Sequence, residues 1–441
     1  MKRLKAFVAD ADLKEILHKG SQAIVFRLSG IVLSYLFTTM VSRNYGIKTW
    51  GTIALAYTVI QLISRFSRLG LDRAALKLIS EQRELKENEA IGNTYTKALS
   101  ILLPSTIVAG VLLALFFEIT GTRFSDQLYA YRWPLGFSIP IFSLLYLNIW
   151  GLRALKKIKE YILLENTSIF LFSIAFLLVY QQVEWQQNIS IIAFFSAIAI
   201  TCVLSFILWM KYGKFSLSVK HGVSSRALFK LAIPLLITSS LYLLMGQIDT
   251  LMIAAYIGEE EVGVYNIFVK VVRFTAIAVT GVESIFLPKI SKFYVNKNWK
   301  GLERMALKSN LLVTGATVVM ALLLLLCTKP ILNFFGADSH LLFATMNTFY
   351  WLLAARFMHA ILGNSPFILN MTDHQKVMTK IALVATLSNV VLNALLIPKI
   401  GIEGAAIASL VSLLVFNLSA VVLVKRIHNI KTSILQKLLT R

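Results

Sequence analysis

The sequence has few charged side chains, and carboxylates are the scarcer kind. Charged residues make up 15% of the 441 positions, with 22 Asp and Glu against 44 Lys and Arg, whereas a soluble domain usually carries about a quarter charged residues. The charges gather in short gaps between apolar runs of roughly 18 to 25 residues, the length that crosses the hydrocarbon of a bilayer. This pattern excludes an ordinary soluble domain and predicts an all-α integral membrane protein.

Cysteine and the common catalytic motifs are also rare or missing. Cys202 and Cys327 are the two cysteines, and both lie in apolar runs, which favours neither a disulfide framework nor a metal site. The sequence lacks GxxxxGK[ST], HExxH, CxxC and Gly-x-Ser-x-Gly motifs. We therefore expect no enzyme activity, no catalytic residue, no metal site and no cofactor, and any transport must be secondary or passive.

The chain divides into two bundles of six predicted transmembrane helices. Residues 1–21 lack a cleavable signal and predict a cytoplasmic amphipathic N-terminus. An N-terminal bundle at 22–210 and a C-terminal bundle at 228–424 flank a basic cytoplasmic linker at 211–227, and a basic cytoplasmic tail follows at 425–441. Because six is even, the two bundles are parallel repeats. The spans are expected near 22–43, 50–70, 97–119, 129–150, 161–180, 189–210, 228–256, 262–285, 307–327, 343–365, 377–397 and 404–424.

An internal similarity supports this duplication. The segment Ala255–Ser291 overlays Asn44–Ser80 at a shift of roughly 211 residues, about half the chain length. Each copy holds a glycine-bounded turn, an apolar stretch with a few basic residues, and a charged linker. Three residue pairs coincide in the overlay: Gly51 with Gly263, Gly70 with Gly281, and Asp72 with Glu283.

The distribution of lysine and arginine predicts the topology. One alternate set of gaps, which includes both chain ends, holds about 29 of them, and the other set holds about five. This bias places both termini in the cytoplasm. The net charge of +22 therefore reflects topology and anionic lipid headgroups, and no nucleic acid partner is needed to explain it.

Three cations are expected deep in the membrane. Lys270 and Arg273 lie near the middle of the span at 262–285, three residues apart on one helix face, and Arg356 lies near the middle of the span at 343–365. A charge at that depth costs at least about 2.5–3.5 kcal/mol. Because the pattern places no carboxylate close to them, we expect these side chains to face a hydrated cationic cavity; hydrogen bonding to helix carbonyls is the structural alternative.

Other basic residues lie closer to span ends. Arg27 and Arg65 lie four or five residues from an end of their expected spans. At that depth each side chain could equally line a cavity or snorkel to the membrane surface. Asp249, toward the outer end of the span at 228–256, is the one carboxylate that we expect could serve ion coupling. Five further cations are expected to snorkel toward an interface: Arg68, Lys97, Arg132, Lys230 and Lys308.

Several segments, taken with the repeat, resemble a known group. They are Gly70-Leu71-Asp72, Gly151–Arg153, Gly258–Tyr265, Leu287–Ser291 and Asn389–Ser409. Their order and spacing resemble the polysaccharide transporter branch, the O-antigen flippases of Wzx type, within the multidrug/oligosaccharidyl-lipid/polysaccharide (MOP) exporter superfamily.

The resemblance implies a flippase of the bacterial inner membrane. Its cargo would be an undecaprenyl-diphosphate-linked oligosaccharide, moved from the cytoplasmic to the periplasmic leaflet by alternating access and coupled to H⁺ or Na⁺. The cationic residues would bind the diphosphate, since arginine matches phosphate through its planar fork and lysine acts as a point charge. Membrane lipids and glycan polymerase or chain-length machinery would be its partners.

Three other readings remain open. Multidrug and toxin extrusion (MATE) exporters share the size and the repeat, but they typically carry intramembrane carboxylates and take cationic drugs, which the cationic interior would repel. Lipid II flippases usually have fourteen spans. A scaffold or polymerase subunit of glycan assembly is the fourth candidate, although the large loops typical of glycan polymerases are missing from this sequence.

Overall fold

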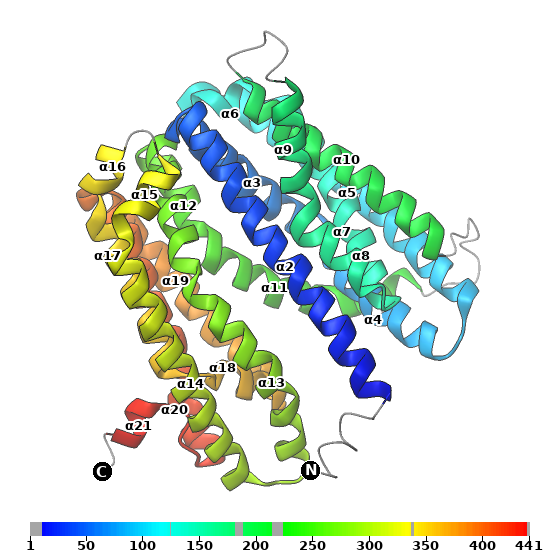
Figure 1. Cartoon of the computed structure of the whole chain (residues 1–441). Coiled ribbons are helices and arrows are strands. Elements are labelled where there is room, and N and C mark those ends of the chain that lie inside the picture. The colour runs from blue at the N-terminus through cyan, green and yellow to red at the C-terminus, as the bar shows by residue number, and fades with distance from the viewer. Residues whose placement is uncertain (1–10, 124, 181–187, 214–223, 337–338, 439–441) are drawn as a thin grey trace. The chain divides into compact units, whose positions relative to one another are not determined.

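The computed structural model describes residues 11–123, 125–180, 188–213, 224–336 and 339–438, and within these ranges every regular element is a helix (Figure 1). The longer helices are α2 (Ala11–Asn44), α3 (Ile47–Ser67), α4 (Leu71–Glu84), α5 (Asn88–Thr120), α7 (Arg132–Ala154), α9 (Ser168–Tyr180), α10 (Ile189–Tyr212), α11 (Ser225–Tyr256), α12 (Glu259–Arg273), α13 (Thr275–Val295), α14 (Trp299–Leu326), α17 (Met346–Leu362), α19 (Gln375–Ile400) and α20 (Ile402–His428). Short elements complete the described chain: η1 (Gly121–Arg123), α6 (Asp126–Ala130), α8 (Ile158–Ile162), the π-helix η2 (Leu163–Thr167), α15 (Thr328–Phe335), α16 (Ser339–Ala344), α18 (Ser365–Met371) and α21 (Ile434–Leu438).

The all-α prediction is confirmed for the described residues, and eight helical stretches there are long and apolar enough to cross a membrane. A ninth is possible if α17 and α18, which bend by 53° at their junction, form one broken span. The expected span at 262–285 is also interrupted, because α12 ends at Arg273 and α13 begins at Thr275. The eight stretches are α5, α7, Ile158–Tyr180, α10, α11, α14, α19 and α20.

Apolar side chains cover much of the outer surface as well as the interior. On α5, Val108 and Leu112 are 57% and 61% exposed, and on α14, Leu311 and Leu312 are 64% and 63% exposed. Such patches on a soluble protein would cause association. Here they are expected, because lipid tails are as apolar as these side chains.

The chain forms two compact units whose boundaries fall inside helices. Unit 1 comprises Met1–Val41 and Ala56–Ser240, and unit 2 comprises Ser42–Leu55 and Leu241–Arg441. The first part of α3 therefore packs with unit 2, and the first part of α11 packs with unit 1. α2 runs without interruption from Ala11, so residues 11–21 belong to the same helix as the first expected span, while residues 1–10 and most of the expected linker lie outside the described residues.

The same order of packing partners recurs in the two units. In unit 1, α4 packs on α5, α5 on α7, α7 on α10, and α10 on α9; in unit 2, α13 packs on α14, α14 on α17, α17 on α20, and α20 on α19. Four helices, α4, α7, α13 and α18, also end in left-handed turns closed by a hydrogen bond from the residue after the turn to a carbonyl five residues earlier. The turn residues pair at about the repeat shift: Lys86 with Lys297, and Lys156 with Asp373.

Within unit 2, the first part of α3 meets α12 at the two glycines that the repeat aligns. A Cβ on Gly51 would collide with the Glu259 carbonyl, and a Cβ on Gly263 would collide with the Ile47 carbonyl. Small residues allow such close backbone approach between membrane helices. The equivalent helices of the duplication therefore cross at equivalent positions.

The end of α17, where the chain bends toward α18, is hydrogen-bonded to α14 and to the C-terminal segment. The α17 carbonyl of Ala360 accepts a hydrogen bond from Asn310 Nδ2 at 2.5 Å, and the carbonyl of Ile361 accepts one from Ser433 Oγ at 2.9 Å. Gly363, with φ of 81°, makes the turn between the two helices. Much of the tail expected at 425–441 is thus packed in unit 2, where Ser433 satisfies the Ile361 carbonyl at the end of α17.

Candidate functional site

The deep cations of unit 2 gather where α12 ends. Lys270 and Arg273 occupy the last turn of α12, where the partial negative charge of the helix C-terminus favours cations. The Lys270 ammonium lies 4.4 Å from the centre of the Trp50 ring, a cation–π contact. Arg356 projects from α17, which packs against α12. The sequence placed Lys270 and Arg273 in mid-span, and the structure places them at a helix end within it.

These charges repel one another. Arg273 is within electrostatic range of both Lys270 and Arg356. Arg273 is exposed and Arg356 is half-buried, and neither has an ion pair in the part of the chain that the structure describes. Mutual repulsion of this kind is relieved by an anion, so the group is suited to bind a multiply charged anionic ligand.

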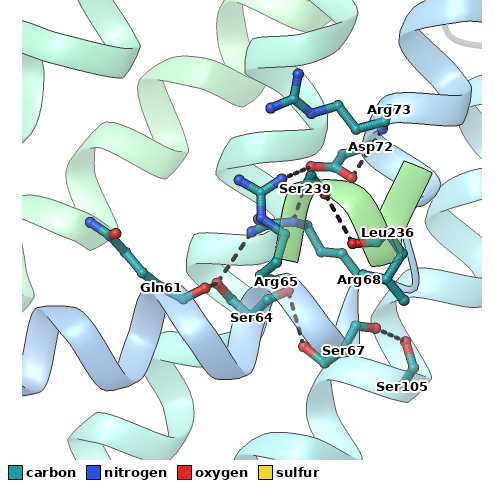
Figure 2. Close-up of polar contacts among 10 residues, drawn as sticks. All are labelled: Gln61, Ser64, Arg65, Ser67, Arg68, Asp72, Arg73, Ser105, Leu236 and Ser239. Carbon is teal, nitrogen blue, oxygen red and sulfur yellow. Dashed lines mark hydrogen bonds and ion pairs between the residues drawn. The ribbon is translucent and has the colours of Figure 1, made fainter. Parts of the chain in front are cut away.

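In unit 1, the basic residues at the end of α3 have a carboxylate partner. Asp72 Oδ2 lies 3.3 Å from Arg68 Nε and 3.5 Å from Arg65 Nη1. Figure 2 shows both guanidinium groups turned toward this carboxylate, while Arg73 extends away from it. Neither cavity lining nor snorkelling, the two explanations open for Arg65, anticipated this ion pair. The expectation that Arg68 snorkels was wrong, because its side chain is only 1% exposed.

The turn between α3 and α4 creates this cluster. Leu69 and Gly70 both adopt positive φ, 54° and 76°, so the chain reverses within a few residues and returns Asp72 over Arg68. Gly70 packs so tightly on the Ala232 carbonyl of α11 that a Cβ would collide with it. A residue without a side chain is required there for two reasons, the backbone conformation and the close approach.

Aromatic rings complete the surroundings of the unit 1 cluster. The Arg68 guanidinium lies 4.8 Å from the centre of the Tyr146 ring, and Arg68 Nη1 donates a hydrogen bond to Ser64 Oγ at 3.2 Å. Arg73 stacks 3.6 Å from the centre of the Trp150 ring. These contacts partly replace the hydration that the buried guanidinium groups lose.

The remaining basic candidates lie elsewhere. Arg27 is exposed on α2, within electrostatic range of Tyr161, and is not part of the Asp72 cluster. Arg132, at the start of α7, forms an ion pair with Glu118. Lys230 and Lys308 are exposed, as snorkelling side chains are expected to be.

Asp249 is held by neutral donors in unit 2. It is 6% exposed, and its Oδ1 accepts a hydrogen bond from Asn393 Nδ2 at 2.7 Å. Its Oδ2 accepts hydrogen bonds from the Tyr265 hydroxyl at 2.6 Å and from Ser409 Oγ. Asn389 extends the network, because its Oδ1 accepts a bond from Asn393 at 3.1 Å. Sequence reasoning found Asp249 but missed its partners, although two asparagines four residues apart in an apolar helix are a signal of a buried polar face.

Comparison with known families decides the assignment. The family model described as "Polysaccharide biosynthesis protein" matches residues 17–294, more than half of the chain, and the MatE family model matches residues 234–395. The chain belongs to the polysaccharide biosynthesis protein family. The membership of the MOP superfamily that the sequence resemblance implied is thereby confirmed. No curated protein matches the sequence.

Solved structures with the same fold are also MOP superfamily members. The lipid II flippase MurJ in an inward closed conformation aligns with a TM-score of 0.72 at 16% identity, covering 91% of this chain and 87% of that one. An inward-facing MATE multidrug transporter aligns at 0.74 with 13% identity, covering 92% and 98%. A MOP transporter from Pyrococcus furiosus, described as having a binding pocket of reverse polarity, aligns at 0.61 with 13% identity, covering 93% of each chain. At these identities the likeness shows the fold alone.

For this member of the polysaccharide biosynthesis protein family, the structure thus separates two kinds of charge. Unit 1 holds arginines that share a buried carboxylate. Unit 2 holds an electrostatically coupled cationic group and, apart from it, a carboxylate bound by neutral donors. In the first arrangement a carboxylate offsets part of the positive charge, and in the second Arg273 and Arg356 have no ion pair among the described residues.

Proposed function

We propose that the protein is a flippase that moves an undecaprenyl-diphosphate-linked oligosaccharide, such as an O-antigen repeat unit, from the cytoplasmic to the periplasmic leaflet of a bacterial inner membrane. The observation that carries the proposal is the group formed by Lys270 and Arg273 at the end of α12 and Arg356 on the adjoining α17, in a chain of the polysaccharide biosynthesis protein family; Arg273 lies within electrostatic range of both of the others. A diphosphate cannot cross hydrocarbon bare, and a group of cations at membrane depth lowers the cost of its passage.

In this proposal the cationic residues bind the headgroup while the polyprenyl tail stays in lipid. Arg273 and Arg356 supply planar forks that can each bind two phosphate oxygens, and Lys270 adds a point charge. Arg65 and Arg27 are the corresponding candidates in unit 1. Alternating access would expose the bound headgroup first to the cytoplasm and then to the periplasm, where glycan polymerase or chain-length machinery would take the product.

Complementation of a flippase-null strain tests the proposal. We expect Arg273→Ala with Arg356→Ala to abolish surface glycan while the protein still inserts in the membrane at normal levels. Lys230→Ala with Lys308→Ala is the matched control, because it removes two exposed lysines and the same charge. Full export by the Arg273 and Arg356 double variant would refute the cationic site.

Asp249 is our candidate for ion coupling. Its carboxylate lies in a buried, hydrogen-bonded polar network and has no ion pair within the described residues, so a proton or a sodium ion could neutralise it during the cycle. Uptake of either cation would weaken the hydrogen bonds from Tyr265 and Asn393, and thereby link ion binding to the packing of α11, α12 and α19.

The same carboxylate favours a second candidate function, a cation-coupled multidrug exporter of MATE type. The MatE match over residues 234–395 includes Asp249. Expression in a drug-sensitive host discriminates the two: a flippase leaves resistance to cationic dyes unchanged, whereas a drug exporter raises it. Lipid II transport, the third alternative, would show as rescue of a strain depleted of its lipid II flippase.

A further inference from the structure

The ion pairs around Asp72 are within contact distance, but their geometry does not make hydrogen bonds. Asp72 Oδ2 is shared by two guanidinium groups at 3.3 and 3.5 Å. Four atoms of these side chains lack a hydrogen-bond partner: Asp72 Oδ2, Arg68 Nε, Arg65 Nη1 and Arg65 Nε. The pairs are therefore held by charge alone, which is weaker than a bidentate arginine–carboxylate contact. Two cations on one carboxylate also leave an excess positive charge.

The two arginines differ in their freedom to move. Arg68 is 1% exposed, and it is fixed by its hydrogen bond to Ser64 and by the ring of Tyr146. Arg65 is 12% exposed, and among the described residues its guanidinium forms an ion pair with Asp72 while its Nε and Nη1 donate no hydrogen bond. Arg68 therefore belongs to the fold, whereas Arg65 can change partner without disturbing the packing.

We propose that Asp72 is a resident counter-ion that sets the anion specificity of Arg65. It holds Arg65 while no cargo is bound, and a diphosphate takes Arg65 over when cargo enters; the inference rests on the proposed flippase function. A diphosphate carries at least two charges and offers oxygens for a bidentate contact, so it competes well with one misaligned carboxylate. The phosphodiester of a bulk lipid carries a single charge and competes poorly. Asp72 thereby makes Arg65 respond to diphosphates and ignore the surrounding lipid.

Binding to the purified full-length protein in detergent tests this exchange. The probes are inorganic pyrophosphate, farnesyl diphosphate and the singly charged diester glycerophosphoglycerol, titrated by calorimetry. We expect Asp72→Asn to bind pyrophosphate about tenfold more tightly than the parent, and to bind the diester measurably where the parent does not. Neither gain should appear when Arg65→Gln is also present, because the freed guanidinium is then missing. If farnesyl diphosphate binds tightly and pyrophosphate does not, the site recognises a lipid-linked headgroup. If the two probes bind with equal affinity, the site recognises the diphosphate alone.

Glu84→Gln is the matched control, because it removes one negative charge from the far end of the same helix. Glu84 is exposed, and its contacts with Arg83 and then Lys156 hold the pKa of this carboxyl below its usual value, so the side chain is charged at neutral pH. We expect the control to bind all probes as the parent does. An equal gain in affinity with Glu84→Gln would mean that net charge, rather than release of Arg65, is responsible, and would overturn the proposal.

A second variant guards against misfolding. If Asp72→Asn alone does not fold, because Arg68 is left buried without its counter-charge, Arg68→Met with Asp72→Asn removes both members of the buried pair and keeps Arg65. Unchanged affinity for pyrophosphate in the folded variant would refute the role of Asp72, as would the absence of any binding. Either result would leave the flippase proposal standing if export still depends on Arg273 and Arg356.

Discussion

The two units each bury a carboxylate, and they satisfy it in opposite ways. In unit 1, Asp72 is fully buried against Arg65 and Arg68, so positive and negative charges lie together. In unit 2, Asp249 takes its hydrogen bonds from the neutral side chains of Tyr265, Asn393 and Ser409. Within the part of the chain that the structure describes, the ion pairs do not include Asp249.

This difference indicates which charges are structural and which are free for ligands. Charges that meet inside a protein stabilise each other, and breaking one member leaves the other uncompensated. Charges kept apart cost more to bury but remain able to bind something from outside. Among the described residues, unit 2 therefore keeps Arg273 and Arg356 out of ion pairs, while unit 1 holds one cluster in which a carboxylate offsets part of the charge of two arginines.

The largest expected effect is a loss of stability when a substitution removes the carboxylate of the unit 1 cluster. Asp72→Ala leaves the Arg68 guanidinium buried without a counter-charge, so we expect a loss of about 3–5 kcal/mol in the free energy of unfolding. Arg273→Ala in unit 2 removes an exposed cation that has no ion pair among the described residues, and it should change stability by no more than about 0.5 kcal/mol. Denaturation of both variants in detergent, followed by circular dichroism, makes the comparison.

Removing the buried pair together provides the control. Arg68→Met with Asp72→Ala deletes both charges, so most of the lost stability should return. If the Asp72→Ala variant is as stable as the parent, the pair contributes nothing to the fold, and the contrast between the units disappears.

A smaller effect is expected at Asp249. In Asp249→Asn, an amide N–H₂ replaces one oxygen and faces donors that it cannot accept from, which should cost about 1–3 kcal/mol. Glycan export should fall as well if the residue couples transport to an ion. Asp126→Asn, an exposed carboxylate at the start of α6, is the control for loss of one charge. Normal export by Asp249→Asn would remove this residue from the coupling mechanism.

Much of the fold could be predicted, because apolar runs, charge placement and the repeat are properties of the sequence itself. The overlay of Gly51 on Gly263 appears in the structure as a helix crossing at those two residues. The break of α12 at Phe274 was not predicted, because no proline or glycine lies beside Phe274 and nothing else in the pattern marks a stop. Beside the bend at Gly363, the Ile361 carbonyl accepts a hydrogen bond from Ser433, some seventy residues later, and such long-range partners leave no local signal.

The site was predicted less well than the fold. The deep cations could be found because burying a charge in the bilayer costs free energy. The partner of Arg68 could not, because it lies four residues later, across a turn that the sequence marks as the end of a span. Pairing there depends on the positive φ of Leu69 and Gly70, which sequence spacing alone does not give. The donors to Asp249 come from α12, α19 and α20, and their convergence is set by packing.

The smallest expected effect comes from giving unit 2 the counter-ion that unit 1 already has. His359 follows Arg356 by three residues on α17, is bonded through Nδ1 to Asn417 Oδ1 at 3.1 Å, and so offers a position that already tolerates a polar side chain. His359→Glu should pair with Arg356 as Asp72 pairs with Arg68, and we expect pyrophosphate to bind about tenfold more weakly, a loss of about 1.4 kcal/mol. His359→Gln keeps the size without the charge and should bind as the parent does, so calorimetry on the two variants isolates the carboxylate. Equal affinity in both would mean that Arg356 does not contact the anion, and the cationic group would then be reduced to Lys270 and Arg273.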